Sequence, residues 1–184
     1  MKFYLETERL ILREILESDI EGMFELDSNP QVHQYLGKKP ITTKDQAEKN
    51  ISFIREQYKE RGIGRFAAIE KRSGEFIGWS GLKLNKGEKE ALNGFENFID
   101  IGYRFIPKYW KKGYGYESAI ACLQLGFQQM KYDVIYGAAD VEKIGSNKIL
   151  QKIGLQFVNE SDYKYDQNKI KVNWYELKKE NYGK

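Results

Sequence analysis

The sequence of 184 residues has few of the residues that build covalently or metal-stabilised folds: one cysteine, one histidine and three prolines. A single cysteine, Cys122, excludes an intramolecular disulfide and any site built from several cysteine ligands. With His33 as the only histidine, a histidine-rich zinc centre is excluded too, and we expect no bound metal. Such cysteine usage is typical of a protein in a reducing, cytoplasmic environment.

Long apolar runs are absent as well. No segment reaches the roughly 18 uninterrupted apolar residues of a membrane-spanning helix, and the first six residues become charged too soon for a signal peptide. The 30 basic and 27 acidic residues nearly balance, with a net charge of +3, so there is no strong general field for a polyanion. We therefore expect a cytoplasmic protein with no membrane attachment and no direct nucleic-acid partner.

Aromatic residues are plentiful, with 13 Tyr, 10 Phe and 3 Trp, and the length suits a single domain over residues 1–184. Hydrophobic periodicity predicts a mixed α/β fold. The predicted strands are 9–15, 66–70, 76–84, 98–106, 134–140, 155–160 and 170–177. The predicted helices are 18–26, 44–61, 116–130 and 146–153.

Local signals mark the ends of the first two helices. Ser18 with Glu21, and Thr43 with Gln46, have the spacing of capping boxes. Asn29-Pro30 is predicted to end the first helix. The nearby His33 is expected on an exposed loop, with a role as a catalytic base as the alternative. Cys122 lies off the apolar stripe of helix 116–130 and is expected to be a buried, inert thiol.

The most informative segment runs from Asp100 to Met130, where a strand, a loop and a helix follow one another. The loop Lys111-Lys112-Gly113-Tyr114-Gly115 has two glycines that allow a sharp turn and the close approach of a ligand. The first N–H groups of the following helix lack partners, and the helix dipole and two lysines add positive charge. The loop therefore predicts a site for the diphosphate of a nucleotide-like cofactor, with an empty tight turn as the alternative.

The loop lacks two common nucleotide motifs. Ser118 stands where a dinucleotide fingerprint would have its third glycine, and no Walker sequence is present. In the strand before the loop, Asp100, Gly102 and Arg104 share one face. A glycine inside a strand marks either a close approach by another group or a simple packing accommodation.

Four segments together resemble a known family. The stretch Ile101 to Ala119 resembles the acetyl-CoA site of the GNAT N-acetyltransferases. More narrowly, the segments Thr7 to Arg13, Ile101 to Tyr103, Tyr109-Trp110 and Lys152 to Leu155 are similar to the ribosomal-protein N-terminal acetyltransferase (RimJ/RimL-like) branch, and the similarity spans about residues 5–177. The resemblance implies a GNAT fold, in which a mostly antiparallel sheet of about seven strands has a splayed parallel pair at its centre and about four flanking helices.

The resemblance also implies acetyl-CoA as co-substrate. Backbone groups of Phe105 and Ile106 would pair with its pantetheine arm. The amides that would hold its pyrophosphate belong to Lys111, Lys112, Gly113, Tyr114, Gly115 and Tyr116. The chain departs from the family at Lys111, where glycine is frequent, and at Lys143, where asparagine is usual. Asn147 is the expected substitute for that asparagine, with a helix cap as the alternative.

Two catalytic residues follow from the same resemblance. Asp100 is expected to act as a base on the amine, directly or through water, with an ion pair to Arg104 as the alternative. Ser146 is expected to protonate the departing thiolate, with an ordinary N-cap as the alternative. An α-amine with a pKa of about 8 is roughly a tenth neutral at pH 7, whereas a lysine is neutral in about one molecule in a few thousand. A weak base therefore suffices for an α-amine.

The expected activity is direct transfer of an acetyl group to a primary amine, either a protein N-terminus or a small-molecule amine, by a monomer or homodimer. One alternative is an antibiotic or polyamine acetyltransferase, which a tight acidic cluster around the acceptor would favour, whereas an open neutral groove would favour a peptide N-terminus. A non-catalytic acyl-CoA-binding module is the alternative of another class, because Lys143 replaces the family asparagine.

Overall fold

The computed structural model describes residues 3–35, 39–165 and 168–183. Within these ranges eight strands form one sheet in the order β1-β2-β3-β4-β5-β6-β8-β7. Their bounds are β1 Tyr4–Glu6, β2 Leu10–Glu14, β3 Arg65–Glu70, β4 Phe76–Lys86, β5 Asn97–Phe105, β6 Val134–Asp140, β7 Gln156–Tyr165 and β8 Asn168–Lys178. All neighbouring strands are antiparallel except β5 and β6, which confirms the predicted mixed α/β architecture with its central parallel pair.

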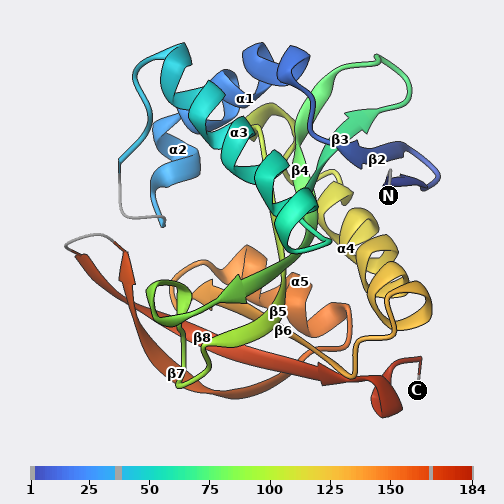
Figure 1. The fold of residues 1–184 in the computed structure, drawn as a ribbon, viewed down its shortest axis with the longest axis vertical. Helices are drawn as coiled ribbons and strands as arrows, with labels where there is room; N and C mark the ends of the chain where they lie inside the picture. The colour runs from blue at the N-terminus through green and yellow to red at the C-terminus, as the bar shows by residue number, and fades with distance from the viewer. Residues whose placement is uncertain (1–2, 36–38, 166–167, 184) are drawn as a thin grey trace.

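Five α-helices flank the sheet in the described part of the chain. They are α1 Ile20–Asp27, α2 Pro30–His33, α3 Lys44–Glu60, α4 Tyr114–Gln124 and α5 Ile144–Lys152. In Figure 1, α1 to α3 gather at one end of the molecule and the long β7–β8 hairpin lies at the other. Helix α4 packs against β4 and β5, and α5 against β6 and β7. The opening between β5 and β6 is thus bordered by helices from both halves of the chain.

The sequence predicted one strand and one helix too few. Strand β1 was missed because it has only three residues, which pair with β2. Helix α1 ends at Asp27, just before Asn29-Pro30, as predicted. Helix α2 was missed because the same dipeptide also begins a new short helix, in which the Asn29 side chain accepts the N–H of Gln31 at 2.9 Å. His33 ends that helix with 5% of its surface exposed, so the prediction of an exposed loop residue was wrong.

The two predicted capping boxes have different outcomes. At α3 the Gln46 side chain accepts the N–H of Thr43 at 3.2 Å, as predicted. At α1 the prediction from Ser18 was wrong. Here Asp19 accepts the N–H of Leu16 at 2.8 Å and also pairs with Arg13, so a single 3₁₀ turn precedes the helix. A partner six residues away therefore outweighed the local signal.

The parallel pair is open over most of its length. Strands β5 and β6 are in register only at Asp100–Tyr136 and Ile101–Gly137. Beyond Ile101 the two strands separate, and the Tyr103 hydroxyl donates to the carbonyl of Ser146 at 3.1 Å across the gap. The backbone edge of β5 is therefore left without a neighbouring strand close to the loop that precedes α4, which confirms the predicted splay.

Cys122 lies on the buried face of α4. Its thiol is fully buried, 3.9 Å from the Ser80 hydroxyl, and burial raises its pKa to about 12. A thiol with so high a pKa is protonated at neutral pH and unreactive. The prediction of an inert core residue is confirmed.

Candidate active site

The loop between β5 and α4 presents a row of free backbone donors. The N–H groups of residues 111–116 have no acceptor among the described residues, and the first helical bond is Glu117 N–H to Gly113 O at 3.0 Å. Gly113 has a φ of 86°, the left-handed region in which glycine is unstrained. Six consecutive donors at a helix N-terminus form a ready site for an anion. We call these residues the 111–116 loop.

Lys111 also adopts the left-handed conformation, with a φ of 61°. The family resemblance expects glycine at this position. The backbone has the left-handed conformation that glycine adopts without strain, although the residue is a lysine. Such a conformation costs a non-glycine residue about 1–2 kcal/mol. Lys111, Lys112 and Gly113 are all exposed, which leaves their amides accessible.

Glu117 links the loop to the N-terminal segment of the chain. Its carboxylate accepts from the Thr7 hydroxyl at 2.6 Å, from the Arg9 N–H at 2.8 Å and from Arg9 Nε at 2.7 Å. Arg9 also donates to the carbonyl of Lys112 at 2.9 Å and lies 4.5 Å from the ring centroid of Tyr114. Desolvation opposes the charge on Glu117, but the bonds from Thr7 and Arg9 prevail and its pKa is lowered. Sequence reasoning missed this support, because it joins segments more than 100 residues apart.

Some backbone groups at the end of β5 already make hydrogen bonds within the protein. The carbonyl of Phe105 accepts from Trp110 Nε1 at 2.6 Å, and the N–H of Ile106 donates to the carbonyl of Ile77 at 3.0 Å. The Ile106 N–H therefore points toward β4 and away from the open side of the sheet. A cofactor arm expected at these two residues would have to use their other backbone groups or displace Trp110.

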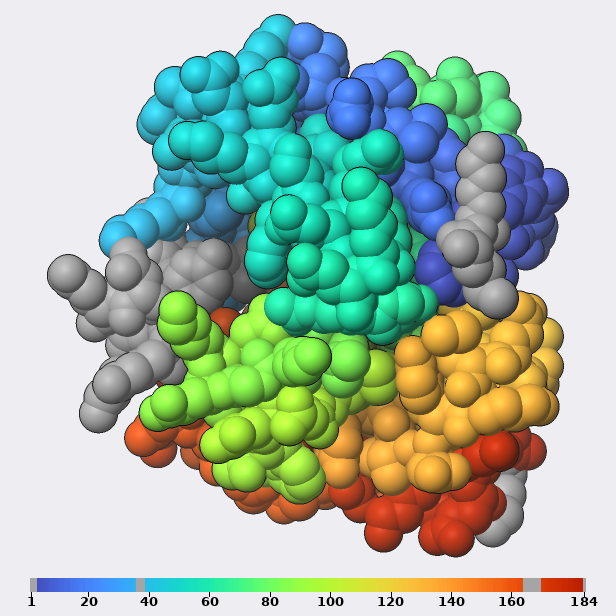
Figure 2. Space-filling model, in the orientation of Figure 1, coloured from blue at the N-terminus to red at the C-terminus, as the bar shows by residue number. Residues whose placement is uncertain are grey.

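A cavity of about 550 Å³ lies on the other side of the strand opening, and we call it the central cavity. It is bordered by α3, β5, the end of β6 and the start of α5, and Asp100, Tyr103, Lys143 and Ser146 are among its lining residues. Figure 2 shows the outer surface of this region, with α3 in the middle and the green segment around β4 and β5 below it. None of the described residues 105–116 lines the cavity, so it is distinct from the 111–116 loop.

Tyr103 lies between the loop and the cavity. Its ring is 3.6 Å from the position that a Cβ on Gly115 would take, and the same side chain lines the cavity. Burial raises the pKa of its hydroxyl, which stays protonated and donates to Ser146. An extended cofactor bound at the loop could therefore reach the cavity along Tyr103.

Asp100 lines the cavity with both carboxylate oxygens engaged. Arg65 Nη2 lies 2.7 Å from one oxygen and Asn85 Nδ2 2.9 Å from the other. The close approach predicted at Gly102 is made by Arg65, because an added Cβ would lie 2.8 Å from Arg65 Nη2. The alternative ion pair between Asp100 and Arg104 is wrong: Arg104 pairs with Asp27 at 2.7 Å instead.

The two arginines flank a single indole. The guanidinium carbons of Arg65 and Arg104 lie 5.5 Å and 5.0 Å from the ring centroid of Trp79. Asp27, 5% of whose side chain is exposed, completes its contacts through Asn50 Nδ2 at 3.0 Å. In this part of the central cavity, Asp27 and Asp100 each have their own arginine.

The start of α5 excludes the alternative role given for Ser146 and shows the contacts of Asn147. The N-cap is Lys143, so Ser146 is not the cap, and its side chain lines the cavity. The Asn147 amide donates to the carbonyls of Asp140 and Lys143 at 2.8 and 3.0 Å. Its oxygen accepts from Asn173 and Tyr175 at 2.9 and 2.7 Å. Asn147 therefore ties α5 to β6 and β8, and both of its donors are used within the protein.

Lys143 lines the central cavity with an unpartnered charge. Its Nζ makes no hydrogen bond or ion pair with any described residue. Desolvation, followed by the nearby charge of Arg104, lowers its pKa to about 8. At neutral pH most molecules therefore still carry the charge. No sequence pattern indicated this burial.

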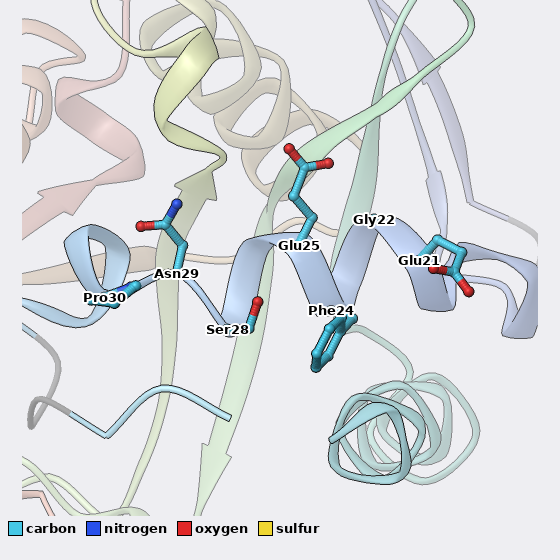
Figure 3. Close-up of a pocket in the computed structure, with 7 residues that line it drawn as sticks. All are labelled: Glu21, Gly22, Phe24, Glu25, Ser28, Asn29 and Pro30. Atoms are coloured by element: carbon cyan, nitrogen blue, oxygen red, sulfur yellow. The ribbon is translucent and has the colours of Figure 1, made fainter. Parts of the chain in front are cut away.

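A second hollow, of about 610 Å³, follows α1 and the turn after it. Figure 3 shows its lining, with the Phe24 ring pointing toward α3 and Glu25 pointing the opposite way. Glu21 pairs with Lys44 at 2.5 Å and Glu25 with Lys108 at 3.2 Å. It shares no lining residue with the central cavity.

Residues 3–35, 39–165 and 168–183 contain neither a metal-binding cluster nor a membrane-spanning helix. No group of three or more His, Cys, Asp or Glu side chains is arranged to hold a metal ion. None of the described helices has the length and hydropathy needed to cross a membrane.

The fold and the site together define a class of protein: an α/β protein with a central sheet that opens between an anion-binding loop and a charged cavity. The acetyltransferase (GNAT) domain matches residues 9–156, and the chain belongs to this family. It is an N-acetyltransferase. The resemblance of its sequence motifs to the GNAT family is thereby confirmed.

Relatives and solved structures agree with this assignment. The uncharacterised N-acetyltransferase YoaA of Bacillus subtilis is 30% identical over 152 residues, which cover 83% of this chain and 82% of YoaA. A GNAT-family acetyltransferase from Bacillus anthracis has a TM-score of 0.78 at 24% identity, with 97% and 99% of the two chains covered. The ribosomal L7/L12 α-N-protein acetyltransferase RimL in complex with coenzyme A has a TM-score of 0.76 at 17% identity, with 96% and 98% covered. At these identities the structures show a shared fold.

Proposed function

We propose that this N-acetyltransferase moves an acetyl group directly from acetyl-CoA to the α-amine of a protein N-terminus or of a small molecule. The observation that carries the proposal is the 111–116 loop, whose six free N–H groups lie beside the opened β5–β6 pair in a chain of the GNAT family. The loop fits a pyrophosphate, since it offers donors, a helix N-terminus and two lysines together. The CoA complex of RimL, a protein of the same fold, supports this cofactor.

The catalytic roles follow from the lining of the central cavity. Acetyl-CoA, when bound, supplies the activated thioester. Asp100, fixed by Arg65 and Asn85, accepts the proton of the acceptor amine through a water molecule, because its two direct partners occupy the nearest positions. The Ser146 hydroxyl, which makes no hydrogen bond with the described residues, donates a proton to the departing sulfur.

The charges in the cavity favour an α-amine over a polycation. Five basic residues line it against four acidic ones. Of the acids, Asp27 and Asp100 each pair with an arginine, and Glu90 pairs with Arg61 and Lys83. The tight acidic cluster that a polyamine or aminoglycoside would need is not found among the described residues. We therefore place antibiotic or polyamine acetylation second.

Transfer assays test the proposal directly. The enzyme is incubated with acetyl-CoA and a panel of short peptides, free amino acids and polyamines, and release of CoA is followed together with the mass of the products. We expect acetylation of α-amines with kcat/KM well above that for polyamines. Tight CoA binding without transfer to any amine would contradict the proposal and support a binding module.

The role of Asp100 has its own test. Asp100→Asn removes the base, and general-base catalysis contributes about 10²–10⁴-fold. We expect the loss in kcat/KM to be largest below pH 7, where neutral amine is scarce, and to shrink toward pH 9. Asp140→Asn, a change at another acid of the cavity, serves as the control. An unchanged pH profile in Asp100→Asn would reject Asp100 as the base.

A further inference from the structure

We propose that Lys143 and Arg104 form an anion subsite in the central cavity, and that the acceptor carries a carboxylate close to its amine. The amine part rests on the proposed function. The anion part rests on the contacts of these two residues and can be tested separately.

Lys143 is a cation without a direct ion pair among the described residues. It lies at the start of α5, lines the cavity and makes no ion pair with any described residue. The nearest candidate, Asp140, is instead engaged through Oδ1 by the N–H of Glu142 at 2.8 Å. A charge removed from water without a partner is costly, so the site gains most from a ligand that supplies an anion.

Arg104 offers further donors from the same cavity. Only its Nη1 is used, by Asp27 at 2.7 Å, and its Nε and Nη2 have no acceptor among the described residues. Stacking on Trp79 at 5.0 Å holds the guanidinium plane in place. A guanidinium with free donors suits a carboxylate, which can accept two parallel bonds.

The two cations line the same cavity. The charge of Arg104 also lowers the pKa of Lys143. Asp27 offsets the charge of Arg104, and Asp100 is paired with Arg65, so neither acid is left for Lys143; Asp140 acts on Lys143 without an ion pair. A bare ammonium would add a further positive charge here, whereas an amine joined to a carboxylate brings its own countercharge.

An apolar wall completes the subsite. Phe98, Trp174 and Val172 line the cavity, and the rings of Phe98 and Trp174 lie 5.2 Å apart in an edge-to-face arrangement. These side chains favour an acceptor with an apolar skeleton. Two sources provide a carboxylate close to an amine: a free apolar amino acid, which also has the apolar skeleton, and a peptide whose first residue is acidic.

Matched acceptors distinguish the sources. Leucine is compared with leucinamide, and a peptide beginning with Asp is compared with the same peptide beginning with Asn, all at pH 7. We expect kcat/KM to favour the carboxylate member of one pair by about tenfold or more, as for other charge-assisted hydrogen bonds. The pair that shows the preference identifies the source. The proposal would be overturned if, in both pairs, the amide had the same kcat/KM as the acid.

Variants of Lys143 test whether this residue causes the preference for the carboxylate acceptor. Lys143→Gln should reduce the acid-to-amide ratio to within about twofold, whereas Lys143→Arg should retain it, because the charge is kept. Lys148→Gln changes an exposed lysine of the same helix and should leave the ratio as in the wild type. A ratio that survives in Lys143→Gln would overturn the assignment to Lys143.

A binding measurement separates this inference from the proposed function. N-acetyl-leucine and N-acetyl-leucinamide are titrated into the enzyme by calorimetry, without acetyl-CoA, together with the N-acetylated Asp and Asn peptides. Tighter binding of a carboxylate member, lost in Lys143→Gln, supports the anion subsite even if no amine is acetylated, in which case the proposed function fails alone. Equal binding of acid and amide in both pairs overturns the subsite even if transfer is observed.

Discussion

A missing side chain at Gly102 sets the position of an acid in the central cavity. An added Cβ there would meet the Arg65 guanidinium at 2.8–2.9 Å, so only glycine leaves room for Arg65 to reach Asp100. Arg65 also donates to the carbonyls of Gly81 and Asp100 at 2.6 and 3.0 Å. The arginine therefore joins β3, β4 and β5 while it orients the carboxylate.

Gly102→Ala tests this arrangement. The new methyl group should displace the flexible end of Arg65, and we expect kcat/KM to fall about tenfold, as for a misplaced catalytic group. The fold should persist, with a lower melting temperature. Gly145→Ala, where an added Cβ meets nothing within 4 Å, is the matched control and should keep wild-type values. Full activity in Gly102→Ala would show that the position of Arg65 is unimportant.

The buried charge of Lys143 predicts a pH-dependent stability. Its pKa is about 8 in the folded state and about 10.4 in the unfolded chain, so the folded state binds fewer protons between these values. Stability therefore rises with pH from about 8 to 10.4. Lys143→Met should be more stable than the wild type at pH 7, by on the order of 2 kcal/mol.

The advantage of Lys143→Met should vanish as the pH approaches 10.4. Thermal unfolding at several pH values measures it, with Lys148→Met as the control for removal of an exposed charge. A stability difference that does not depend on pH would mean that Lys143 titrates normally. The destabilising charge is consistent with a residue kept for binding.

The element that carries the cofactor proposal is α4 together with the 111–116 loop. Two positive φ values, at Lys111 and Gly113, bend the chain so that successive N–H groups point outward before the helix begins. The same element is anchored to the N-terminal segment by Thr7 and Arg9 through Glu117. Its shape therefore depends on both local backbone strain and one long-range ion pair.

Gly113→Val separates binding from folding. Because φ is 86° at Gly113 and 73° at Gly74, a branched residue should cost each site a similar 1–2 kcal/mol of stability, roughly. Gly74 lies in the β3–β4 turn, so Gly74→Val is the matched control. We expect the Kd for CoA, measured by calorimetry, to rise at least about tenfold only in Gly113→Val. Equal affinities in the two variants would indicate a purely structural turn.

At the scale of the whole molecule, the opened sheet separates two regions of different chemistry. On one side the 111–116 loop offers donors for an anion, and on the other the central cavity offers paired acids and arginines. The antiparallel pairing of β6 with β8 extends over seven residue pairs and holds β6 in place although it pairs with β5 at only two. Strand β6 therefore stays in the sheet through its pairing with β8, even where it separates from β5.

A ligand that bridges the opening should stabilise the entire fold. Binding to the folded state alone at a hundred times Kd adds about 2.7 kcal/mol, which for a chain of this size is roughly 5–10 °C in Tm. We expect saturating acetyl-CoA to produce such a shift in a thermal-unfolding assay, and Gly113→Val to show little. ATP is the control for a nucleotide without a pantetheine arm, and an equal shift with ATP would contradict a specific CoA site.

Much of the fold could be predicted from the sequence where the signal is local. The strand 134–140 coincides with β6, and α3 begins after Thr43 with Gln46 as its cap, because periodicity and capping act within a few residues. Helix α2 was missed because Asn-Pro serves equally to end one helix and to begin another.

For the site, too, only the part built from neighbouring residues could be predicted from the sequence. The residues of the 111–116 loop are consecutive, so their free amides could be anticipated. Arg65 and Asp27 could not be foreseen as partners of Asp100 and Arg104, since 35 and 77 residues separate the members of each pair. Asn147 likewise has partners on two other elements.

The sequence by itself determined the family, the order of most elements and the loop with free N–H groups, because each depends on neighbouring residues. Only the tertiary structure decided which acid each arginine neutralises and that Lys143 is half-buried without an ion pair, because these depend on contacts between distant segments. A charge is solvated or buried according to what packs over it, and that packing exists only in the folded chain.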